Sequence, residues 1–290
     1  MTILFEVFMI VKNEEEMVAG ALETVKEAES IVVVDTGSTD KTLEIVKKYT
    51  DKIYTDYKWN DDFAEAKNYA LSKCTADWVM SIDADCRLEK GGIAKILKAI
   101  KNAKHNVIKV KLFSGKNYHY RPKIFTRTPD HYHVGMNQEY VAGTHLSDDS
   151  DISIEYLDSP NHKKDPDRNM RSLKKALAKN PKLTREKFYL AREYFYKKNY
   201  PHAIYLFDKY LSESKWLAEK AEAYYHKALC WWYLNEGDKA RESVLQALAI
   251  NADMKKALEL MAKMSWPDNK KKWLEYAKMA TSNGVLFKTL

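Results

Sequence analysis

Cysteine is scarce in this 290-residue chain, and neither a long apolar run nor a basic amino-terminal leader is present. The three cysteines, Cys74, Cys86 and Cys230, lack close pairing and metal-ligand spacing, which predicts reduced thiols in a cytosolic protein. A membrane-spanning helix needs roughly 18 consecutive apolar residues, and no segment approaches that length. We therefore expect a cytoplasmic protein without a signal peptide or membrane span, although its basic residues allow peripheral contact with a membrane.

Length and charge divide the chain into two parts. A chain of this length is nearly twice as long as a typical domain and can bury a sizeable core. Residues 1–165 contain 23 Lys and Arg against 27 Asp and Glu, whereas residues 166–290 contain 25 against 14. We expect two domains with these bounds. The basic second domain either meets an acidic partner or carries a solvated helical surface.

Three apolar runs predict a parallel sheet in the first part. Residues 5–11, 31–35 and 78–82 each read as a buried strand, and a polar turn and a helical pattern follow the first two. This order is typical of an α/β sheet with right-handed crossovers. The turn after the second strand joins a carboxylate to a glycine, with Ser38 or Thr39 expected as a helix cap. Ligands bind at this edge of open α/β sheets.

Two aspartates, Asp83 and Asp85, follow the third strand with one small residue between them. Residues two apart in a strand point to the same side, so both carboxylates can reach one hard cation such as Mg or Mn. A pair of this kind is also common by chance. The spacing alone therefore indicates a candidate metal site, and it needs support from the rest of the sequence.

Four motifs supply that support, namely Phe8-Met-Ile-Val-Lys-Asn-Glu14, Val33-Val-Asp-Thr-Gly-Ser-Thr-Asp-Lys-Thr42, Trp59-Asn-Asp-Asp-Phe-Ala-Glu-Ala-Lys-Asn68 and Asp83-Ala-Asp85. Their order and spacing resemble those of glycosyltransferase family 2. The likeness is greatest to members with a helical-repeat tail, such as bacteriocin-peptide S-glycosyltransferases and lipopolysaccharide-core enzymes. It implies a GT-A type, Rossmann-like mixed sheet followed by an all-α tetratricopeptide-like domain, and inverting transfer from a nucleotide-sugar donor, most simply a UDP-sugar.

The resemblance also implies which residues hold the donor. The expected contacts are the backbone of Ile10 and Val11, the side chains of Asn13, Glu14 and Asp35 at the nucleoside, Lys67 and Asn68 at a phosphate or sugar hydroxyl, and Asp83 at the ribose or a metal-bound water. Relatives carry arginine where this chain has Lys67. As structure alone, the Lys67 segment would be a helix capped by Asp61 or Asp62.

A divalent cation, Mn or Mg, is implied as the cofactor, with Asp85 as its direct ligand beside Asp83. His162 resembles the late histidine of the family, which completes the metal site opposite the aspartates. An imidazole ligand suits Mn better than Mg. The cation would neutralise the departing diphosphate. The alternative for His162 is a surface linker residue.

The acceptor side is expected in residues 120–139, which resemble an arginine-rich strand followed by Gly-x-x-His-Glu. Glu139 matches the family's glutamate and is the expected catalytic base. Gln138 stands where histidine is usual and cannot exchange a proton, so a histidine role is lost or has moved to His131 or His133. Lys123 stands where relatives often have arginine, and supplies a point charge without a bidentate fork.

Helical patterns replace strand-like runs after about residue 165. Small and large residues recur at tetratricopeptide positions in two units, namely Leu190, Ala191, Tyr194, Ala203 and Phe207, then Ala228, Trp231, Ala240 and Val244. Small residues at these positions let antiparallel helices approach closely. Helical segments at 167–180 and 254–283 would complete a short solenoid. The aromatic residues of the first unit are expected in helix packing.

Three alternatives stay open for function. The first is an active glycosyltransferase with a hydroxyl or thiol acceptor on a peptide, saccharide or other macromolecule, held by the basic tail. The second is a non-catalytic scaffold that binds peptide or nucleic acid, a role that Gln138 favours. The third is a DNA-base glycosyltransferase, which would bind DNA with a steep salt dependence. The sequence reveals neither the sugar, the acceptor nor the oligomeric state.

Overall fold

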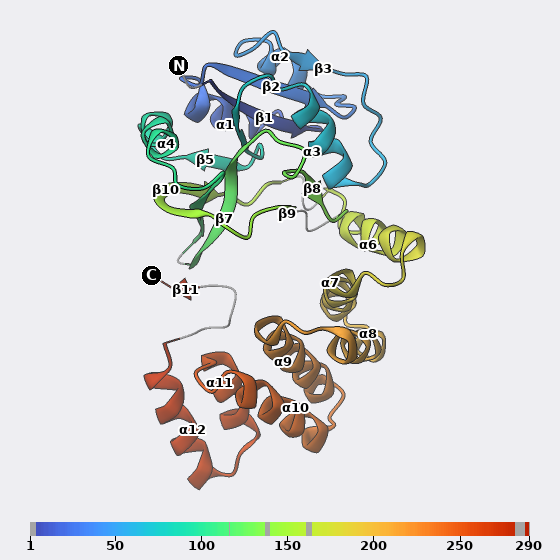
Figure 1. The fold of residues 1–290 in the computed structure, drawn as a ribbon. Coiled ribbons are helices and arrows are strands. Elements are labelled where there is room, and N and C mark those ends of the chain that lie inside the picture. The colour runs from blue at the N-terminus through green and yellow to red at the C-terminus, as the bar shows by residue number, and fades with distance from the viewer. Residues whose placement is uncertain (1–3, 116, 137–139, 161–163, 282–287, 290) are drawn as a thin grey trace. The chain divides into compact units, whose positions relative to one another are not determined.

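The computed structural model describes residues 4–115, 117–136, 140–160, 164–281 and 288–289 (Figure 1). The chain forms two compact units, residues 1–168 and residues 169–290. Each unit is described by itself. No helix in the described part of the chain is both long and apolar enough to cross a membrane.

The first unit combines strands and helices in alternation along most of its length. Its elements are β1 (Phe5–Val11), α1 (Val18–Val25), β2 (Ser30–Asp35), α2 (Thr42–Val46), β3 (Ile53–Tyr54), α3 (Phe63–Ser72), β4 (Trp78–Ser81), β5 (Cys86–Leu88), α4 (Gly92–Lys101), β6 (Val107–Ser114), β7 (Asn117–Thr126), β8 (His133–Val134), β9 (Tyr140–Val141) and β10 (Asp148–Tyr156). The three strands expected from the sequence are therefore present as β1, β2 and β4.

Eight strands of this unit form one mixed sheet in the order β3-β2-β1-β4-β7-β6-β10-β5. The strands β1 to β4 run parallel to one another, β7 is antiparallel to β4 and β6, and β5 is antiparallel to β10. The strands β8 and β9 make a separate antiparallel pair. The predicted α/β class with a mixed sheet is confirmed.

Alternate residues of the central strands divide between two hydrophobic cores. In β1, Val7 and Met9 pack in one core with α1 and α4, whereas Phe8 and Ile10 pack in the other with α3. This alternation follows from the period of two in a strand and explains why the run is apolar throughout. Burying each such side chain contributes roughly 1.5 to 3 kcal/mol. The sheet is thereby held between helices on both faces, which keeps its strand ends in register.

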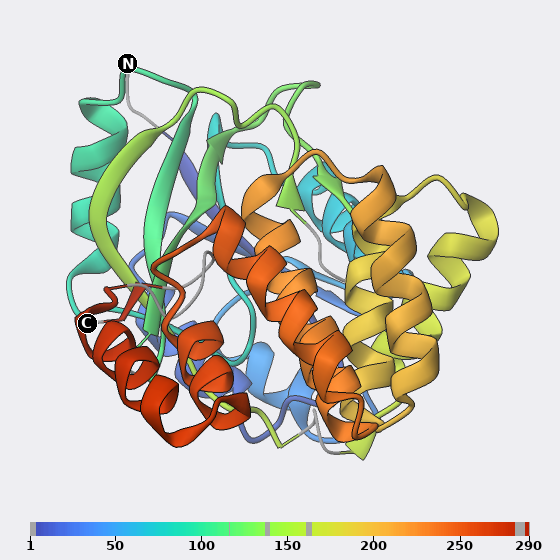
Figure 2. The same ribbon diagram turned by 90° about the horizontal axis from the view of Figure 1, so that it is seen from below.

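The second unit is helical, apart from a short strand near the chain end. It contains α6 (Arg168–Lys179), α7 (Thr184–Tyr196), α8 (Tyr200–Glu213), α9 (Leu217–Tyr233), α10 (Gly237–Ile250), α11 (Lys255–Met264), α12 (Pro267–Met279) and β11 (Lys288–Thr289). The helices α9 and α10 lie side by side in Figures 1 and 2 and share one core. The expected helical tail is confirmed, while its assignment to tetratricopeptide repeats stays a prediction.

Small residues of the second unit are fully buried where the repeat pattern places them. Ala191 and Ala203 lie in the core of α7 and α8, and Ala228 and Ala240 lie in the core of α9 and α10. The segment expected at 254–283 consists of two helices, because Pro267 begins α12 at its first turn after a break at Ser265. Small buried residues thus permit close helix packing in both pairs.

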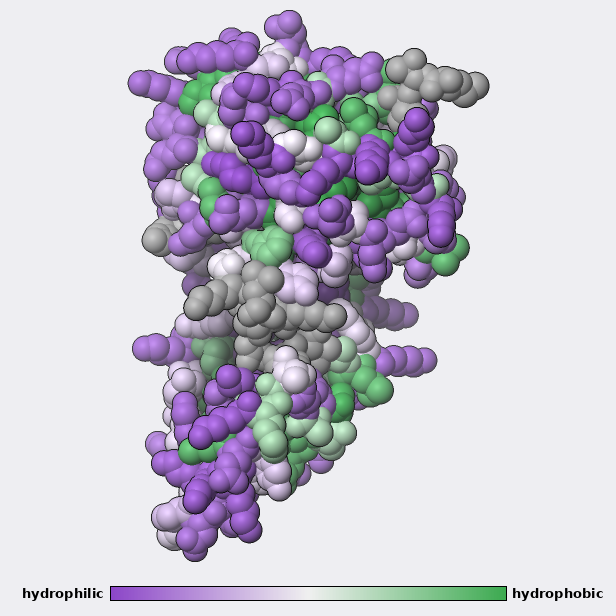
Figure 3. All heavy atoms as spheres, turned by 90° about the vertical axis from the view of Figure 1, so that its left-hand side faces the viewer, coloured by the Kyte–Doolittle hydropathy of each residue, from purple (hydrophilic) through white to green (hydrophobic). Residues whose placement is uncertain are grey.

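In contrast to these apolar cores, the face of the first unit seen in Figure 3 is covered mainly by hydrophilic side chains.

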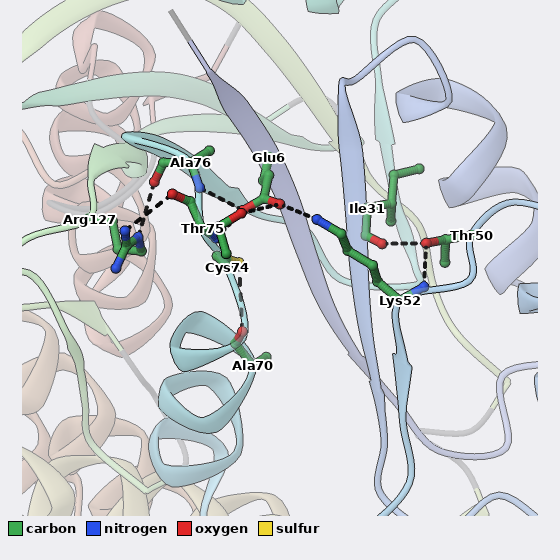
Figure 4. A network of polar contacts seen from close by, with 9 residues as sticks. All are labelled: Glu6, Ile31, Thr50, Lys52, Ala70, Cys74, Thr75, Ala76 and Arg127. Carbon is green, nitrogen blue, oxygen red and sulfur yellow. Dashed lines mark hydrogen bonds and ion pairs between the residues drawn. The ribbon is translucent and has the colours of Figure 1, made fainter.

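One acidic residue, Glu6 in β1, is buried in the interior of the first unit (Figure 4). Its carboxylate pairs with Lys52 at 2.7 Å and accepts hydrogen bonds from the backbone N–H groups of Thr75 and Ala76. Burial opposes ionisation, but the Lys52 and backbone hydrogen bonds lower the pKa of Glu6 to about 2. Glu6 thereby fixes the turn between α3 and β4.

Candidate functional site

The carboxyl ends of β1 and β2 meet at one edge of the sheet. Their parallel register pairs Ile10 with Val34 and Val11 with Asp35. The Thr36 backbone N–H donates to the carbonyl of Val11 at 2.9 Å, which continues the contact beyond the strands. The structure therefore brings the first two expected donor-binding segments together, at the edge where open α/β sheets bind ligands.

The loop after β1 is tied to the loop after β2 by hydrogen bonds. Asn13 has a φ of 55°, in the left-handed region that asparagine tolerates, and its side-chain oxygen accepts from the Thr39 backbone N–H at 2.7 Å. The Asn13 backbone N–H donates to Ser38 Oγ at 2.9 Å, and that of Glu14 donates to Thr42 Oγ1 at 2.7 Å. Asn13 and Glu14 are thus held against the second loop.

These bonds overturn the expected helix cap at Ser38 or Thr39. Helix α2 begins only at Thr42, after Lys41, and has no side-chain cap. Ser38 does not cap α2, because its hydroxyl accepts the backbone N–H of Asn13 instead. The residue types around Ser38 favour a helix cap, but the Ser38 hydroxyl is bonded to the backbone of Asn13, 25 residues away in the sequence.

Asp35 is buried and shapes the second loop. Its carboxylate accepts the backbone N–H groups of Gly37 at 3.1 Å and Ser38 at 3.0 Å. Gly37 has a φ of 107°, a conformation that favours glycine. Each carboxylate oxygen has more than one lone pair, so these bonds leave acceptor capacity for a ligand N–H group. The turn therefore orients Asp35 at the sheet edge.

Helix α3 brings a lysine into the site. Asp62 caps the helix by accepting the Glu65 backbone N–H at 3.0 Å, which confirms one of the two expected caps. Trp59 and Phe63 pack edge to face, with 4.9 Å between their ring centroids. Lys67 lies one turn further along and is 3% exposed. A lysine buried to this extent needs a partner of opposite charge.

That partner is Asp83, which lies between two lysines. Lys67 Nζ is 2.7 Å from Asp83 Oδ1, and Lys123 Nζ is 3.2 Å from Asp83 Oδ2. Burial alone would raise the pKa of Asp83, but the ammonium groups of Lys123 and Lys67 hold it well below its usual range. Lys67 and Lys123 therefore both contact the first aspartate of Asp83-Ala-Asp85.

Asp85 is more deeply buried than Asp83 and lies beside Tyr156 of β10. Burial raises the pKa of Tyr156 far above its usual value, and the negative charge of Asp85 and a hydrogen bond to that carboxylate add to the effect. Cys86 Sγ lies 3.8 Å from Asp85 Oδ1, and burial together with the charge of Asp83 raises the pKa of the Cys86 thiol to about 12. Cys86 is thus a neutral packing residue. Sequence reasoning missed Tyr156, because its strand begins with charged residues.

The donor chemistry of Asp83 and Asp85 fits a hard divalent cation. Both offer carboxylate oxygens, which Mg and Mn prefer, but the two oxygens of Asp83 already contact lysines. Within the described residues, no three metal-ligating side chains gather in one place. Asp85 is therefore the residue of this pair that fits a direct ligand.

Asn68 is engaged with the backbone of β8. Its side-chain N–H donates to the carbonyl of His133 at 2.8 Å, and its oxygen accepts the His133 N–H at 2.7 Å. The sequence predicted a phosphate or sugar hydroxyl as the Asn68 partner. The amide instead fixes β8 to α3 in this structure, which places Asn68 in a supporting position.

The two candidate histidines are both buried. His131 Nδ1 donates to the carbonyl of Thr126 at 2.8 Å. His133 packs edge to face on Phe8 and Phe125, and its ring nitrogens have no hydrogen-bond partner within the described residues. Burial and the positive charges of Lys67 and Lys123 lower the pKa of His133 to about 2. His133 is therefore neutral at physiological pH and unsuited to hold a proton.

Three residues with expected roles, Gln138, Glu139 and His162, lie outside the described residues. The roles of Glu139 as base and of His162 as metal ligand therefore stay predictions. The described part of the site consists of the β1 and β2 loops, the lysine-bound Asp83, and Asp85 with Tyr156. A mixed sheet whose parallel strands present these groups at their carboxyl ends has the architecture of a GT-A type domain.

Comparison with known proteins identifies the family. The model of glycosyl transferase family 2 matches residues 6–150, half of the chain. The chain therefore belongs to glycosyl transferase family 2, as its four motifs predicted. A stretch of 86 residues is 38% identical to the lipopolysaccharide core biosynthesis glycosyltransferase LpsC of Rhizobium meliloti, covering 29% of this chain and 32% of that protein.

Two further proteins are similar to this chain. A stretch of 97 residues is 35% identical to the prophage-derived glycosyltransferase SunS of Bacillus subtilis, covering 32% of this chain and 23% of that protein. The crystal structure of S. aureus TarS 1–349 in complex with UDP-GlcNAc aligns with a TM-score of 0.49 and 13% identity, over 85% of this chain and 91% of that one. The matched stretches span less than a third of LpsC and of SunS.

Proposed function

We propose that this protein transfers a sugar, with inversion, from a nucleotide-sugar donor to a hydroxyl or thiol of a macromolecular acceptor. One observation carries the proposal. The Asp35 loop follows β2, whereas the lysine-bound Asp83 and the buried Asp85 follow β4, and both strands pair in parallel with β1, so these groups lie at one edge of the sheet. Membership of glycosyl transferase family 2 supplies the reaction class.

The nucleoside would bind at the β1 and β2 loops. The backbone of Ile10 and Val11 would line its pocket, and Asn13 and Glu14 would contact it from the loop that Ser38 and Thr42 hold. Backbone hydrogen bonds fix the orientation of the Asp35 carboxylate, which would accept an N–H group of the base. Uracil is the simplest candidate for that base. A UDP-sugar is therefore the proposed donor.

Charge balance at the diphosphate supports a divalent cation. At this position two lysines, Lys67 and Lys123, stand against two carboxyl groups, those of Asp83 and Asp85, so the side chains bring no excess of positive charge. The diphosphate of a sugar nucleotide is a dianion, so these side chains alone leave its charge unbalanced. Mn or Mg, bound through Asp85 and completed by His162, would supply that charge as a Lewis acid. Asp83 would then contact the ribose, in an orientation set by the two lysines.

At the anomeric carbon, the transfer step would form one bond to the acceptor and break one to the diphosphate. The acceptor oxygen or sulfur attacks the anomeric carbon from the face opposite the diphosphate, and the bond from that carbon to the diphosphate oxygen breaks. Glu139 would take the acceptor proton, and the nucleoside diphosphate leaves with the electron pair. The basic residues 166–290, with 25 Lys and Arg against 14 Asp and Glu, would hold the macromolecular acceptor, a peptide or saccharide rather than DNA.

The first test is isothermal titration of the protein with nucleoside diphosphates and their sugars, with Mn present and then with a chelator. Mn-dependent binding of a single nucleotide sugar is the expected result. Absence of binding to every member of the panel would overturn the donor site and favour a non-catalytic binding protein.

A second test separates binding from transfer. Glu139→Gln should leave donor affinity near normal while abolishing transfer, because glutamine keeps the shape and cannot take a proton. A normal transfer rate in this variant would show that another group is the base.

A further inference from the structure

The strands β6 and β7 form a hairpin whose charged residues are all basic. Residues 107–126 contain five Lys and Arg and no Asp or Glu, although residues 1–165 as a whole have an acidic excess. A hairpin with charge of one sign repels itself unless neighbouring elements supply the opposite charge. A cation of this hairpin that has no such partner is therefore available to bind an anion from outside the chain.

Most of the described cations in this hairpin have a partner. Lys123 contacts Asp83, Lys109 Nζ lies 3.5 Å from Asp149 Oδ1, and Lys111 Nζ lies 6.0 Å from the ring centroid of Tyr120. Lys116 lies outside the described residues. Arg121 differs from these, because it is a half-buried residue whose guanidinium has neither a hydrogen bond nor an ion pair within the described part of the chain.

The neighbourhood of Arg121 is electrostatically positive. Burial, with the charges of Arg121 and Lys123 added to it, lowers the pKa of His119 to about 4. His119 is therefore neutral at pH 7, which avoids a further positive charge beside Arg121. The guanidinium remains the charged group of this position, and its five donors in a planar fork match a carboxylate or phosphate.

Arg121 also lies close to the proposed donor site. It precedes Lys123 by two residues in β7, where the pairing with β6 is irregular, because Ile108 pairs with Ile124 but Lys109 pairs with Pro122. Lys123 in turn contacts Asp83 at 3.2 Å. Because β7 runs antiparallel to β4 with Met80 opposite Ile124, Arg121 lies in the part of β7 that extends past the carboxyl end of β4, the end from which Asp83 follows.

We propose that Arg121 binds a phosphate or carboxylate group of the acceptor, so that the substrate accepting the sugar is an anionic saccharide or peptide. This inference rests on the proposed function. A bidentate guanidinium contact orients the acceptor as well as attracting it. The anion would be the partner that the described part of the chain does not supply to Arg121.

The test uses the whole 290-residue chain saturated with UDP and Mn, titrated with glucose 6-phosphate, glucuronate and uncharged glucose. The two anions should bind at least tenfold more tightly than glucose. Arg121→Gln should weaken anion binding about tenfold, as expected for loss of a charge-assisted hydrogen bond, and Arg121→Lys should retain part of it. The matched control is Lys98→Gln, which removes an equal charge from the exposed face of α4 and should change nothing.

Equal binding of glucose 6-phosphate by the wild type and Arg121→Gln would overturn the inference. A second comparison locates the anion on the acceptor or on the transferred sugar. If Arg121→Gln weakens UDP-glucuronate but not UDP-glucose, the anion belongs to the donor and the acceptor assignment is wrong. Loss of UDP binding by the wild type would instead overturn the proposed function, whereas retained UDP binding without anion binding would overturn this inference alone.

Discussion

Lys67 Nζ and Asp83 Oδ1 lie 2.7 Å apart, and the lysine side chain is only 4% exposed. The two residues belong to α3 and to the turn after β4, so the ion pair joins a helix to the edge of the sheet. Lys123 contacts the other oxygen of the same carboxylate. Asp83 therefore balances the charge of the buried Lys67 and of the partly buried Lys123, in addition to its proposed contact with the donor.

Removing Asp83 should destabilise the fold. Asp83→Asn would leave Lys67 and Lys123 as like charges in a poorly solvated site, at a cost of about 2 to 4 kcal/mol in the free energy of unfolding. Urea denaturation measures this cost. Adding Lys67→Met to Asp83→Asn should recover part of it, and a double variant no more stable than Asp83→Asn would contradict the pairing as the cause.

Asp85→Asn should abolish the effect of Mn on UDP-sugar binding. The amide has no negative charge, so a divalent cation loses its proposed ligand, and addition of a chelator should no longer change the affinity. Titration calorimetry with and without Mn measures this. Tyr156→Phe removes the hydrogen bond to Asp85 but not the carboxylate, and it should keep a Mn response. A full Mn response in Asp85→Asn would rule out Asp85 as the ligand.

Glu6 should make stability depend on acidic pH. Its pKa is about 2 in the folded protein and 4.5 in its ordinary state, so its contribution is fully present above about pH 4.5 and is lost as pH falls towards 2. At neutral pH the contribution is roughly 2 to 3 kcal/mol, since the carboxylate is buried while Lys52 is half exposed.

Glu6→Gln should therefore lower stability at pH 7 and flatten the stability profile between these pH values. Unfolding in urea across a pH series measures both effects. Glu23→Gln is the matched control, because Glu23 forms an exposed ion pair with Lys26 one turn away. An equal loss in both variants would show that the buried network around Glu6 contributes no more to the free energy of unfolding than an exposed ion pair does.

Asn68 should be intolerant of aspartate. Its amide both donates to and accepts from the backbone of His133, and a carboxylate would face the His133 carbonyl as a second acceptor. We expect Asn68→Asp to lose about 1 to 3 kcal/mol in the free energy of unfolding at neutral pH. Thermal or urea unfolding measures it. If Asn68→Asp loses nothing, the paired hydrogen bonds do not hold β8 to α3.

Much of the first unit follows from local patterns. The apolar runs that became β1, β2 and β4 needed only the strand period of two and residues that fill both faces of a buried sheet. Asp62 capped α3 because a cap requires a side-chain oxygen three residues before its N–H partner. By contrast, β10 was not predicted, since its sequence begins with charged residues and only its later part alternates.

The sequence by itself determined the α/β class, the family, the helical second half and the identities of the charged residues at the strand ends. Only the tertiary structure decided which of them meet. Ser38 accepts a hydrogen bond from Asn13 in place of the expected helix cap. Lys123 contacts Asp83, 40 positions away in the sequence, because β7 pairs antiparallel with β4. Local rules depend on neighbours a few residues apart, whereas the partner of a side chain depends on strand order and register, which no local pattern encodes.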